Sequence, residues 1–493
     1  MDSILERAEA RRVAALAALD PEAQRQLGQF FTPAPAAALI ASLPAVDALP
    51  ARMVRVLDPG AGSGSLTAAL VDRLARERPG LAVHVVAVET DPAVIPALSE
   101  TLADCERIEG VTTELVSGDF LAGSTGMDPD PRLLGPFDLV IMNPPYGKQP
   151  AGDHLRRSVA REHVDTPNLY SAFWALGVAA LAPGGQCVAI VPRSWANGSY
   201  FAAFRRWLLD RVHLDALHVF ESRSTVFADT GVLQENVIVS ATRGAHGGPV
   251  TLSASVGHAD EVTRQTVPAS VVVQPEDPHM FVRFTDGAAR VPAAARFTLA
   301  ELGLTVSTGR VVDFRCRPYL SDDPNEPGTV PLIYPGNVRG GGVEWPREIR
   351  KAQAYRVAEE AARRWLLPAG NYALTKRFSA KEERRRVVAG VCSMGGPVAL
   401  ENHLNYFHER GGGLPLELAR GLSVWLNSTA VDELFRTFSG HTQVNAGDLR
   451  TLPYPSREDL AQLGRELPGA LPDQGAVDAV VSRVLDGVAA VAS

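Results

Sequence analysis

The chain has 493 residues, which predicts two to four domains and supplies enough apolar material for a large core. It is 46% hydrophobic and 21% charged and has no low-complexity tract or internal repeat, so its composition is that of a globular protein rather than a disordered one. The net charge of −8, taken over the whole chain, argues against nucleic-acid binding, but this argument does not hold for each part of the chain separately.

The charge is unevenly distributed along the chain. Residues 1–150 hold 12 Lys or Arg against 20 Asp or Glu, a balance of −8. Residues 301–400 hold 16 Lys or Arg against 11 Asp or Glu, a balance of +5. The sequence is therefore acidic early and basic late, and the late part is the candidate for contact with a polyanion.

Nothing in the sequence indicates export, a membrane or a metal. The segment 1–7 is polar and lacks the apolar core of a signal peptide. No apolar run approaches the roughly 20 residues that a membrane-spanning helix needs. The four cysteines are far apart, without the spacing of a metal or redox site. We expect reduced thiols in a cytoplasmic protein that holds no metal.

The chain begins with an amphipathic pattern over residues 1–20, and we assign residues 1–25 to an N-terminal helix. Gly28-Gln29-Phe30-Phe31-Thr32-Pro33 follows, before an apolar helical pattern over 36–43. Thr32 suits an N-cap and Pro33 suits a first helical turn. A plain helix start explains this string as well as a binding role does.

A strand is predicted over residues 52–57, and helical spacing resumes over 66–75. Between them lies Asp58-Pro59-Gly60-Ala61-Gly62-Ser63-Gly64-Ser65. Glycines there permit positive φ and let a ligand touch the backbone, and the helix N-terminus offers unpaired N–H groups. The pattern predicts a binding loop, although a Gly-rich turn alone also suits NAD enzymes.

Two further strands are each followed by an acidic residue. The strand over 83–88 is followed by Glu89, placed where a carboxylate can accept hydrogen bonds from ribose hydroxyls. Asp91 is better placed to cap the helix that we expect from Pro92. The strand over 114–116 is followed by Asp119, which could accept from an exocyclic amine or be an ordinary solvated residue at a strand end.

A fourth strand, over residues 137–142, runs into Asn143-Pro144-Pro145-Tyr146. Its apolar, β-branched character is typical of a buried parallel strand. The prolines stop the strand, and Pro144 forces Asn143 into an extended conformation. An amide, a stiff turn and an aromatic ring are therefore expected at the carboxyl edge of a sheet, where ligands bind in open α/β folds.

The alternation continues with helices over 168–182 and 199–211 and strands over 186–191, 214–219 and 237–240. We place a domain boundary near residue 243, which gives domains over 26–243 and 244–493. The later domain is less regular. It contains a basic helical stretch over 376–386 and helices over 416–427, 429–437 and 474–490.

Taken in order, these pieces resemble the class I S-adenosylmethionine-dependent methyltransferases, and within them the amino-group DNA methylases, over residues 26–240. Gly28–Pro33 looks like the Phe-x-Thr-Pro motif of γ-ordered adenine methylases, and Asn143–Tyr146 matches the catalytic Asn-Pro-Pro-Tyr. The resemblance implies a Rossmann-like α/β domain with a mostly parallel seven-stranded sheet. A mixed α+β target-recognition domain is expected to follow it.

The resemblance also implies roles for single residues. Phe31, Thr32, Asp58, Gly60, Gly62 and Asn143 would border S-adenosylmethionine, Glu89 would hold its ribose and Asp119 its adenine amino group. Many relatives carry Pro-Ala-Cys-Gly after the acidic residue of the cofactor loop, whereas this chain has Pro-Gly-Ala-Gly. The acidic start is kept at Asp58, so recognition of the methionine amine is still expected.

Methylation of a base amine is difficult because the nitrogen lone pair is delocalised into the ring. The Asn143 side-chain carbonyl and the Pro144 backbone carbonyl can accept both amine hydrogens and localise that lone pair toward the methyl donor. Tyr146 offers a ring face to a base swung out of the duplex. By analogy with the family, Phe227 is the candidate for the opposite face, although Phe220 is near and a core role is the ordinary one for a phenylalanine.

A finer resemblance is to type II adenine modification methylases of the PstI/BsuBI sort, and more loosely to the TaqI type. It rests on residues 28–33, on Val232-Leu233-Gln234-Glu235-Asn236 and on residues 438–446. It implies N6-adenine methylation of double-stranded DNA in a prokaryotic restriction–modification system. The enzyme would be a monomer, and a cognate endonuclease would act separately. The alternative is a methyltransferase for RNA guanine or protein glutamine, which uses the same tetrad.

The basic late region is the expected DNA-holding part. Its candidate phosphate contacts are Lys376, Arg377, Lys381, Arg384, Arg385 and Arg386. A solvated helix face explains these residues equally well. His441, Gln443 and Asn445 form a polar segment suited either to base contacts or to docking the two domains.

Overall fold

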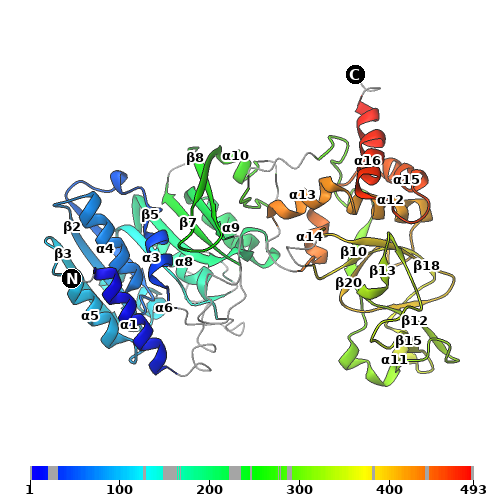
Figure 1. Ribbon diagram of the computed structural model, residues 1–493, viewed down its shortest axis with the longest axis horizontal. Coiled ribbons are helices and arrows are strands. Elements are labelled where there is room, and N and C mark those ends of the chain that lie inside the picture. The colour runs from blue at the N-terminus through cyan, green and yellow to red at the C-terminus, as the bar shows by residue number, and fades with distance from the viewer. Residues whose placement is uncertain are drawn as a thin grey trace. The chain divides into compact units, whose positions relative to one another are not determined.

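The computed structural model divides the chain into two compact units, Met1–Asp286 and Gly287–Ser493, which we call unit 1 and unit 2. The structure describes residues 3–19, 31–125, 129–147, 164, 166, 168–220, 235–244, 247–275, 277, 279–285, 291–379, 384–438 and 443–489. Figure 1 shows the elements of both units.

Unit 1 is built on a nine-stranded sheet (Figure 1). In spatial order its strands are β3 (Val111–Ser117), β2 (Ala82–Glu89), β1 (Met53–Pro59), β4 (Phe137–Met142), β5 (Leu181–Pro192), β7 (Asn236–Arg243), β6 (Val212–Phe220), β8 (Pro249–Ser255) and β9 (Thr263–Pro268). The first five strands run parallel, and β7 runs antiparallel to both β5 and β6. The predicted α/β architecture is confirmed, with two strands more than the seven expected.

Helices cover both faces of this sheet. They are α1 (Ile4–Ala18), α3 (Ala34–Ala41), α4 (Ser65–Glu77), α5 (Ile95–Cys105), α6 (Phe120–Thr125), α8 (Leu169–Ala179), α9 (Ala202–Leu209) and α10 (Ala269–Val272). Helices α1, α3, α4 and α5 pack on one another, and α8 packs on the opposite face. At Gly177 of α8, an added Cβ would lie 2.6 Å from Cε of Met142, so this helix approaches the strand that carries the tetrad very closely.

The division between the units falls at residue 286, beyond the boundary expected near residue 243. The reason is long-range pairing: β8 joins β6 in parallel, with Ala216 opposite Thr251, and β9 pairs with β8. Helix α1 also belongs to unit 1, since Arg7 and Arg11 bind Asp104 of α5 at 2.8 and 2.7 Å. Burial opposes ionisation of Asp104, but these two guanidinium groups hold its pKa below the usual value.

Unit 2 is mixed α+β, as predicted. Its six-stranded sheet has the order β10 (Thr305–Thr308), β20 (Leu404–His408), β17 (Gly370–Lys376), β18 (Ala389–Met394), β14 (Gly342–Val343) and β13 (Val338–Arg339). A five-stranded sheet has the order β11 (Leu320–Ser321), β15 (Ala354–Arg356), β12 (Thr329–Ile333), β19 (Val398–Leu400) and β16 (Leu366–Leu367). Its helices are α11 (Glu360–Arg363), α12 (Leu416–Leu426), α13 (Thr429–Phe438), α14 (Ala446–Thr451), α15 (Arg457–Glu466) and α16 (Gln474–Ala489).

The basic stretch over 376–386 is not the predicted helix where the structure describes it. Lys376 is the last residue of β17, and residues 384–386 are irregular. Arg386 is 1% exposed, its Nε donates to Ser379 Oγ at 3.2 Å, and its backbone N–H donates to Asp432 of α13. The prediction that Arg386 contacts phosphate is therefore wrong, because a sequence pattern cannot distinguish a buried guanidinium from a solvated one.

The polar segment around residue 443 is partly structural. Asn445 caps α14, where its side chain and that of Asp448 form a reciprocal capping box, and it accepts a bond from Arg377 at 3.5 Å. All of these contacts lie within unit 2. His441 lies outside the described residues.

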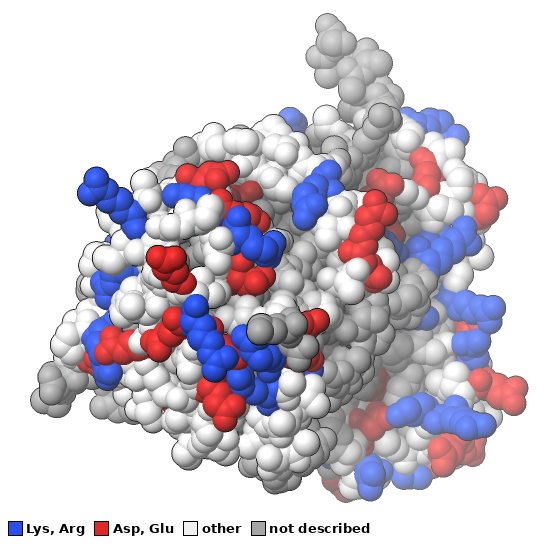
Figure 2. Space-filling view, turned by 60° about the vertical axis from the view of Figure 1, so that its left-hand side comes forward, with Lys and Arg blue, Asp and Glu red and all other residues white. Residues whose placement is uncertain are grey.

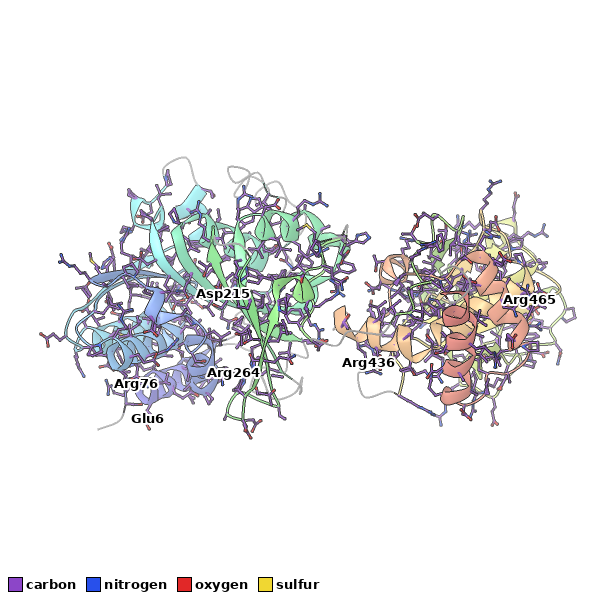
Figure 3. All side chains as sticks on the ribbon, turned by 90° about the horizontal axis from the view of Figure 1, so that it is seen from above. Glu6, Arg76, Asp215, Arg264, Arg436 and Arg465 are labelled. Atoms are coloured by element: carbon purple, nitrogen blue, oxygen red, sulfur yellow. The ribbon has the colours of Figure 1, made fainter. Side chains whose placement is uncertain are left out.

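Two further observations concern the charges on the surface and the length of the helices. Basic and acidic side chains are interspersed over the face of the molecule seen in Figure 2. On α4, for example, Arg76 pairs with Asp72 at 3.0 Å and is 65% exposed (Figure 3). None of the helices that the structure describes is long and apolar enough to cross a membrane.

Helices α12 and α15 cross at two glycines, and this close crossing can be tested by measuring the stability of a glycine variant. A Cβ at Gly421 would collide with the backbone carbonyl of Leu460, and one at Gly464 with that of Glu417. We expect Gly421→Ala to lower the free energy of unfolding of the full chain in urea by about 1–3 kcal/mol, because the two backbones must separate.

Gly447→Ala is the control, since Gly447 lies in α14 with no atom near its Cβ position. It should stabilise the chain by about 0.5–1 kcal/mol, as alanine does in a helix. Equal effects of the two variants would show that the close crossing is not there.

Candidate active site

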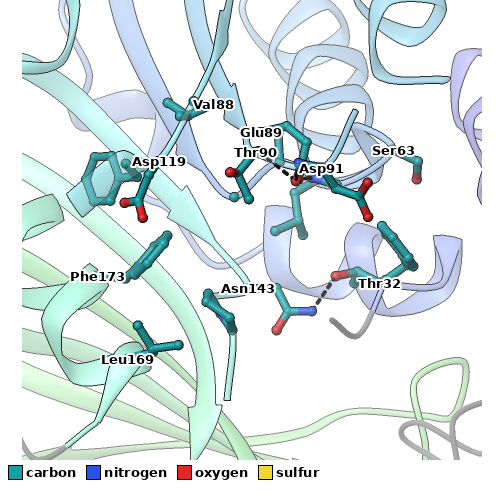
Figure 4. Close-up of a pocket in the computed structure, with 18 of the residues that line it drawn as sticks. Thr32, Ser63, Val88, Glu89, Thr90, Asp91, Asp119, Asn143, Leu169 and Phe173 are labelled. Carbon is teal, nitrogen blue, oxygen red and sulfur yellow. Dashed lines mark hydrogen bonds between the residues drawn. The ribbon is translucent and has the colours of Figure 1, made fainter. Parts of the chain in front are cut away.

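A cavity of about 460 Å³ opens at the carboxyl ends of β1, β2, β3 and β4 (Figure 4). Its lining residues come from six separate segments of the sequence. They are Phe31 and Thr32; Gly60–Ser63, Ser65 and Leu66; Val88–Pro92 and Gly118–Leu121; and Asn143, Pro145, Leu169 and Phe173. The structure therefore brings together most of the residues that the sequence marked separately.

The Gly-rich loop after β1 has the backbone conformation that its glycines predict. Gly60, Gly62 and Gly64 have φ of 78°, 57° and 87°, and Gly64 is the left-handed N-cap of α4. A Cβ at Gly62 would lie 2.8 Å from the ring of Phe31. The N–H groups of Gly60 and Ala61 donate to the Val88 carbonyl at 3.0 and 2.8 Å, which fixes this loop beside the end of β2.

Glu89, the last residue of β2, binds two loops at once. Its Oε2 accepts the Gly62 N–H at 2.9 Å, and its Oε1 accepts the N–H groups of Thr90 and Asp91, each at 2.8 Å. The side chain is 7% exposed and faces the cavity. Because a carboxylate has about four acceptor positions, this rigid group can still accept from a ligand hydroxyl.

Asp119 stands at the end of β3, on the same cavity. Its Oδ1 accepts the N–H groups of Leu121 and Ala122 at 2.7 and 3.1 Å and so caps α6. Its Oδ2 has no partner among the described residues and is the oxygen open to a ligand. Beside it, the rings of Phe120 and Phe173 lie 5.1 Å apart, which makes an apolar wall suited to a flat aromatic group.

Asp58 does not line the cavity, contrary to the expectation from its place in the cofactor loop. It is fully buried beneath the loop, where its Oδ2 accepts the Thr67 hydroxyl at 2.7 Å and its Oδ1 has no partner. Burial, and then the charge of Glu89, raise the pKa of Asp58 to about 7. The bond to Thr67 ties the end of β1 to helix α4.

Within the tetrad, the Asn143 amide is held from two sides. Its Nδ2 donates to Thr32 Oγ1 at 3.0 Å, and its Oδ1 accepts the Tyr146 hydroxyl at 2.9 Å (Figure 4 shows the first bond). Thr32 is 5% exposed and precedes Pro33, which is the N-cap of α3, so its hydroxyl is a partner of the tetrad and not the expected helix cap. Pro144 is buried, whereas Pro145 borders the cavity.

Tyr146 lies inside the protein in this structure, with only 8% of its surface exposed. Its hydroxyl is also 3.2 Å from the Ile190 carbonyl, and its ring meets Tyr170 edge to face with centroids 6.4 Å apart. The free ring face that the sequence suggested is therefore not presented in this conformation. Phe227, the second predicted stacking residue, lies outside the described residues.

Sequence reasoning did not identify Phe120, Leu169 or Phe173 as cavity residues. Leu169 and Phe173 lie on α8, a helix so uniformly apolar that its pattern could not show which side chains reach a ligand. Phe120 directly follows Asp119, and that adjacency was the only local signal. Among the described residues, no group of three or more His, Cys, Asp or Glu could hold a metal ion.

The buried Asp58 predicts a pH-dependent stability. The pKa of Asp58 is near 7 in the folded protein and 3.8 in the ordinary, unfolded state. The protonated carboxyl therefore adds its full share to the free energy of unfolding below about pH 4, and this share is lost as the pH rises to about 7. At 1.36 kcal/mol per pKa unit, wild type should lose about 2 kcal/mol relative to Asp58→Asn between pH 5 and pH 7, and little above that. Urea unfolding of both chains from pH 5 to 8 measures this difference, and parallel curves would contradict it.

Comparison with known proteins shows what the chain as a whole is similar to. The family model described as Eco57I restriction-modification methylase matches residues 123–227. Type II methyltransferase M.BsuBI of Bacillus subtilis is 41% identical over 455 residues, which cover 89% of this chain and 90% of its own. Type II methyltransferase M.PstI of Providencia stuartii is 35% identical over 491 residues, 96% of each chain.

Among solved structures, the type IIL restriction-modification enzyme MmeI in complex with DNA aligns over 98% of this chain and 79% of its own. The TM-score is 0.60 and the identity 11%, a likeness of fold alone. The two type II methyltransferases, by contrast, match closely over nearly the whole chain, both units included. This sets aside the alternative of an RNA or protein methyltransferase. The chain belongs to the type II DNA methyltransferases of restriction–modification systems.

Proposed function

We propose that this protein transfers the methyl group of S-adenosylmethionine to N6 of an adenine within a specific sequence of double-stranded DNA. The observation that carries the proposal is the Asn143-Pro144-Pro145-Tyr146 tetrad, which meets the cavity through Asn143 and Pro145 at the carboxyl edge of the sheet. An amide oxygen and a proline carbonyl are acceptors for the two hydrogens of a base amine.

The methyl donor of this enzyme is S-adenosylmethionine, and the cavity suits it. A Cβ at Gly62 would collide with the Phe31 ring, so glycine at this position lets the loop and Phe31 together form one wall of the cavity. Glu89 would hold the ribose hydroxyls, Asp119 Oδ2 would accept from the adenine amine, and Phe120 and Phe173 would enclose the adenine ring. The bound donor supplies an electrophilic methyl group on its sulfonium.

Asn143 Oδ1 already accepts a hydrogen bond from the Tyr146 hydroxyl. In our account the amine of an extruded adenine takes the place of that hydroxyl, and the Pro144 carbonyl accepts its second hydrogen. The Tyr146 ring then leaves its buried position and stacks on the base, with Phe227 proposed for the other face. Two acceptors in tetrahedral directions localise the nitrogen lone pair toward the methyl group.

Unit 2 is proposed to recognise the target sequence. Its residues 301–400 carry the excess of positive charge, and Arg384 is exposed to solvent there. Phosphate contacts position a protein on DNA, while contacts to base edges specify the sequence. Because one chain carries both units, we propose that it acts as a monomer and that a separate endonuclease cleaves the unmodified sequence.

The cofactor cradle is tested by Gly62→Ala. The left-handed φ costs a non-glycine residue about 1–2 kcal/mol, and the new methyl group would press on Phe31. We expect the Kd for S-adenosylmethionine, measured by titration calorimetry, to rise at least about tenfold.

Gly80→Ala is the matched control for this variant. Gly80 has φ of 81°, so the backbone strain is the same, but no atom lies near its Cβ position and it is outside the cavity. Its cofactor affinity should equal that of wild type. A similar loss of affinity in both variants would show that backbone strain alone, and not a contact at the cavity, lowers the affinity for S-adenosylmethionine.

The tetrad is tested by Asn143→Ala, which removes both amide atoms. S-adenosylmethionine should still bind, while single-turnover methyl transfer to DNA should fall at least about 10²–10³-fold, as on removal of one preorganised polar group at a reacting centre. Mass spectrometry of the nucleosides should find N6-methyladenine from wild type. The exposed Ser99→Ala, on α5 of unit 1 and outside the cavity, is the control and should keep its activity.

Two results would contradict this account. Methylated cytosine in place of N6-methyladenine would refute the proposed target base. Transfer by Asn143→Ala at the wild-type rate would remove Asn143 from its role.

A further inference from the structure

Asn236, the first residue of β7, carries a buried amide that the protein leaves unbonded. Its side chain is 2% exposed, and neither Nδ2 nor Oδ1 has a hydrogen-bond partner among the described residues. Each buried polar group without a partner costs about 1–3 kcal/mol, and such groups are rare in folded proteins. A hydrophobic side chain would be more stable at this position, so the amide needs another explanation.

Strand register places Asn236 on the same face of the sheet as Asn143. Ile141 of β4 pairs with Val188 of β5, and Pro192 of β5 pairs with Asn236 of β7. Registered partners share a face, and so do residues an even number apart in one strand. Val188 and Pro192 are four residues apart, and Asn143 lies two residues beyond Ile141, so all five residues belong to one face.

Contacts from the helices confirm this assignment for Asn143. Its amide bonds Thr32, at the start of the segment that carries α3. Gln186, which alternation places on the same face of β5, exchanges two bonds with Ala45, at the end of that segment, at 2.7 and 3.0 Å. The opposite face, with Met142, is the one that packs on Gly177 of α8.

The two amides flank the place where a base must bind. Asn143 and Asn236 are separated by two strand spacings, and Asn236 lies about two residues further out, which puts their Cα atoms about 12 Å apart. Ile190 of β5 lies between them in the register, and its carbonyl is the one that the Tyr146 hydroxyl approaches at 3.2 Å. That phenol therefore lies between Asn143 and β5, the strand that separates the two amides.

We propose that Asn236 contacts the target base, its amide N–H donating to a ring nitrogen of the extruded adenine beside the amine that Asn143 accepts. This inference rests on the proposed function and adds a residue that recognises the base. Adenine offers acceptor nitrogens on both sides of its amine, N1 and N7, and an asparagine amide is a suitable partner for that edge. Binding the base satisfies the amide that the free protein leaves unbonded.

Asn197, like Asn236, has a buried amide without a hydrogen-bond partner, but it does not lie at the same position in the sheet. It is also 2% exposed with both amide atoms unbonded, yet it follows the turn Arg193–Ala196, after the chain has left β5. Register therefore does not assign it to the Asn143 face. Burial without a partner and position at the catalytic edge coincide in Asn236.

The inference is tested with duplexes in which only the target adenine is replaced, by 7-deazaadenine or by 1-deazaadenine. We expect wild type to lose about tenfold in single-turnover rate on one of the two, the analogue that lacks the contacted nitrogen. Asn236→Ala should show that same loss on natural adenine and no further loss on that analogue. This non-additivity is the signature of a direct bond, which a structural role would not produce.

Stability provides the second readout, because a ligand residue and a structural residue respond oppositely. Asn236→Leu should raise the free energy of unfolding, since it removes unbonded polar atoms, while it lowers the rate of methylation. Gln186→Leu is the matched control on the same face: it is equally buried, but both of its amide atoms are bonded, so it should be destabilised.

The outcomes separate this inference from the proposed function. Additive effects of Asn236→Ala and both analogues, or a loss of stability in Asn236→Leu like that of Gln186→Leu, would overturn the role of Asn236 alone. Failure of wild type to methylate natural adenine would overturn the proposed function, and this inference with it.

Discussion

The arrangement of the site depends on how the Asn143 amide is held. Thr32 accepts from its nitrogen at 3.0 Å, and the Tyr146 hydroxyl donates to its oxygen at 2.9 Å. These two bonds join the end of β4 to the start of α3 and to the packed aromatic ring that follows the two prolines. An amide fixed at both ends presents a defined donor and a defined acceptor, which is what recognition of a base amine requires. The cavity, the glycine loop and the sheet edge then determine what can approach that amide.

Two buried polar side chains near this edge of the sheet, Asp58 and Asn236, have atoms that the protein itself leaves unbonded. Oδ1 of Asp58 is buried without a partner under the glycine loop, and both amide atoms of Asn236 are unbonded two strands away from Asn143. Folded proteins tolerate such costs mainly where function requires them. By contrast, Gln186 lies on the same face further from the edge and has both amide atoms bonded. On this face, therefore, the fold satisfies the buried amide of Gln186 but not that of Asn236.

Local patterns predicted the parts of the fold that depend on local physics. The glycine loop, the strand that precedes it and Glu89 were identifiable because turn chemistry and the alternation of strand and helix are written in short stretches of sequence. Contacts between distant segments were not predictable in this way. Strands β8 and β9 extend the sheet beyond the expected boundary because of their pairing with β6, and no local pattern near residue 243 records that pairing. Likewise, Asp58, Tyr146 and Arg386 are buried because of packing between distant segments, which the amino-acid sequence alone does not show.

We propose that the base amine replaces the Tyr146 hydroxyl on Asn143. A crystal structure with a non-reactive analogue of S-adenosylmethionine and a duplex containing the modified sequence tests it most directly. We expect the N6 atom of an extruded adenine about 3 Å from Asn143 Oδ1, with the Tyr146 hydroxyl withdrawn from that oxygen. An adenine bound elsewhere, with the bond between Tyr146 and Asn143 intact, would contradict the account.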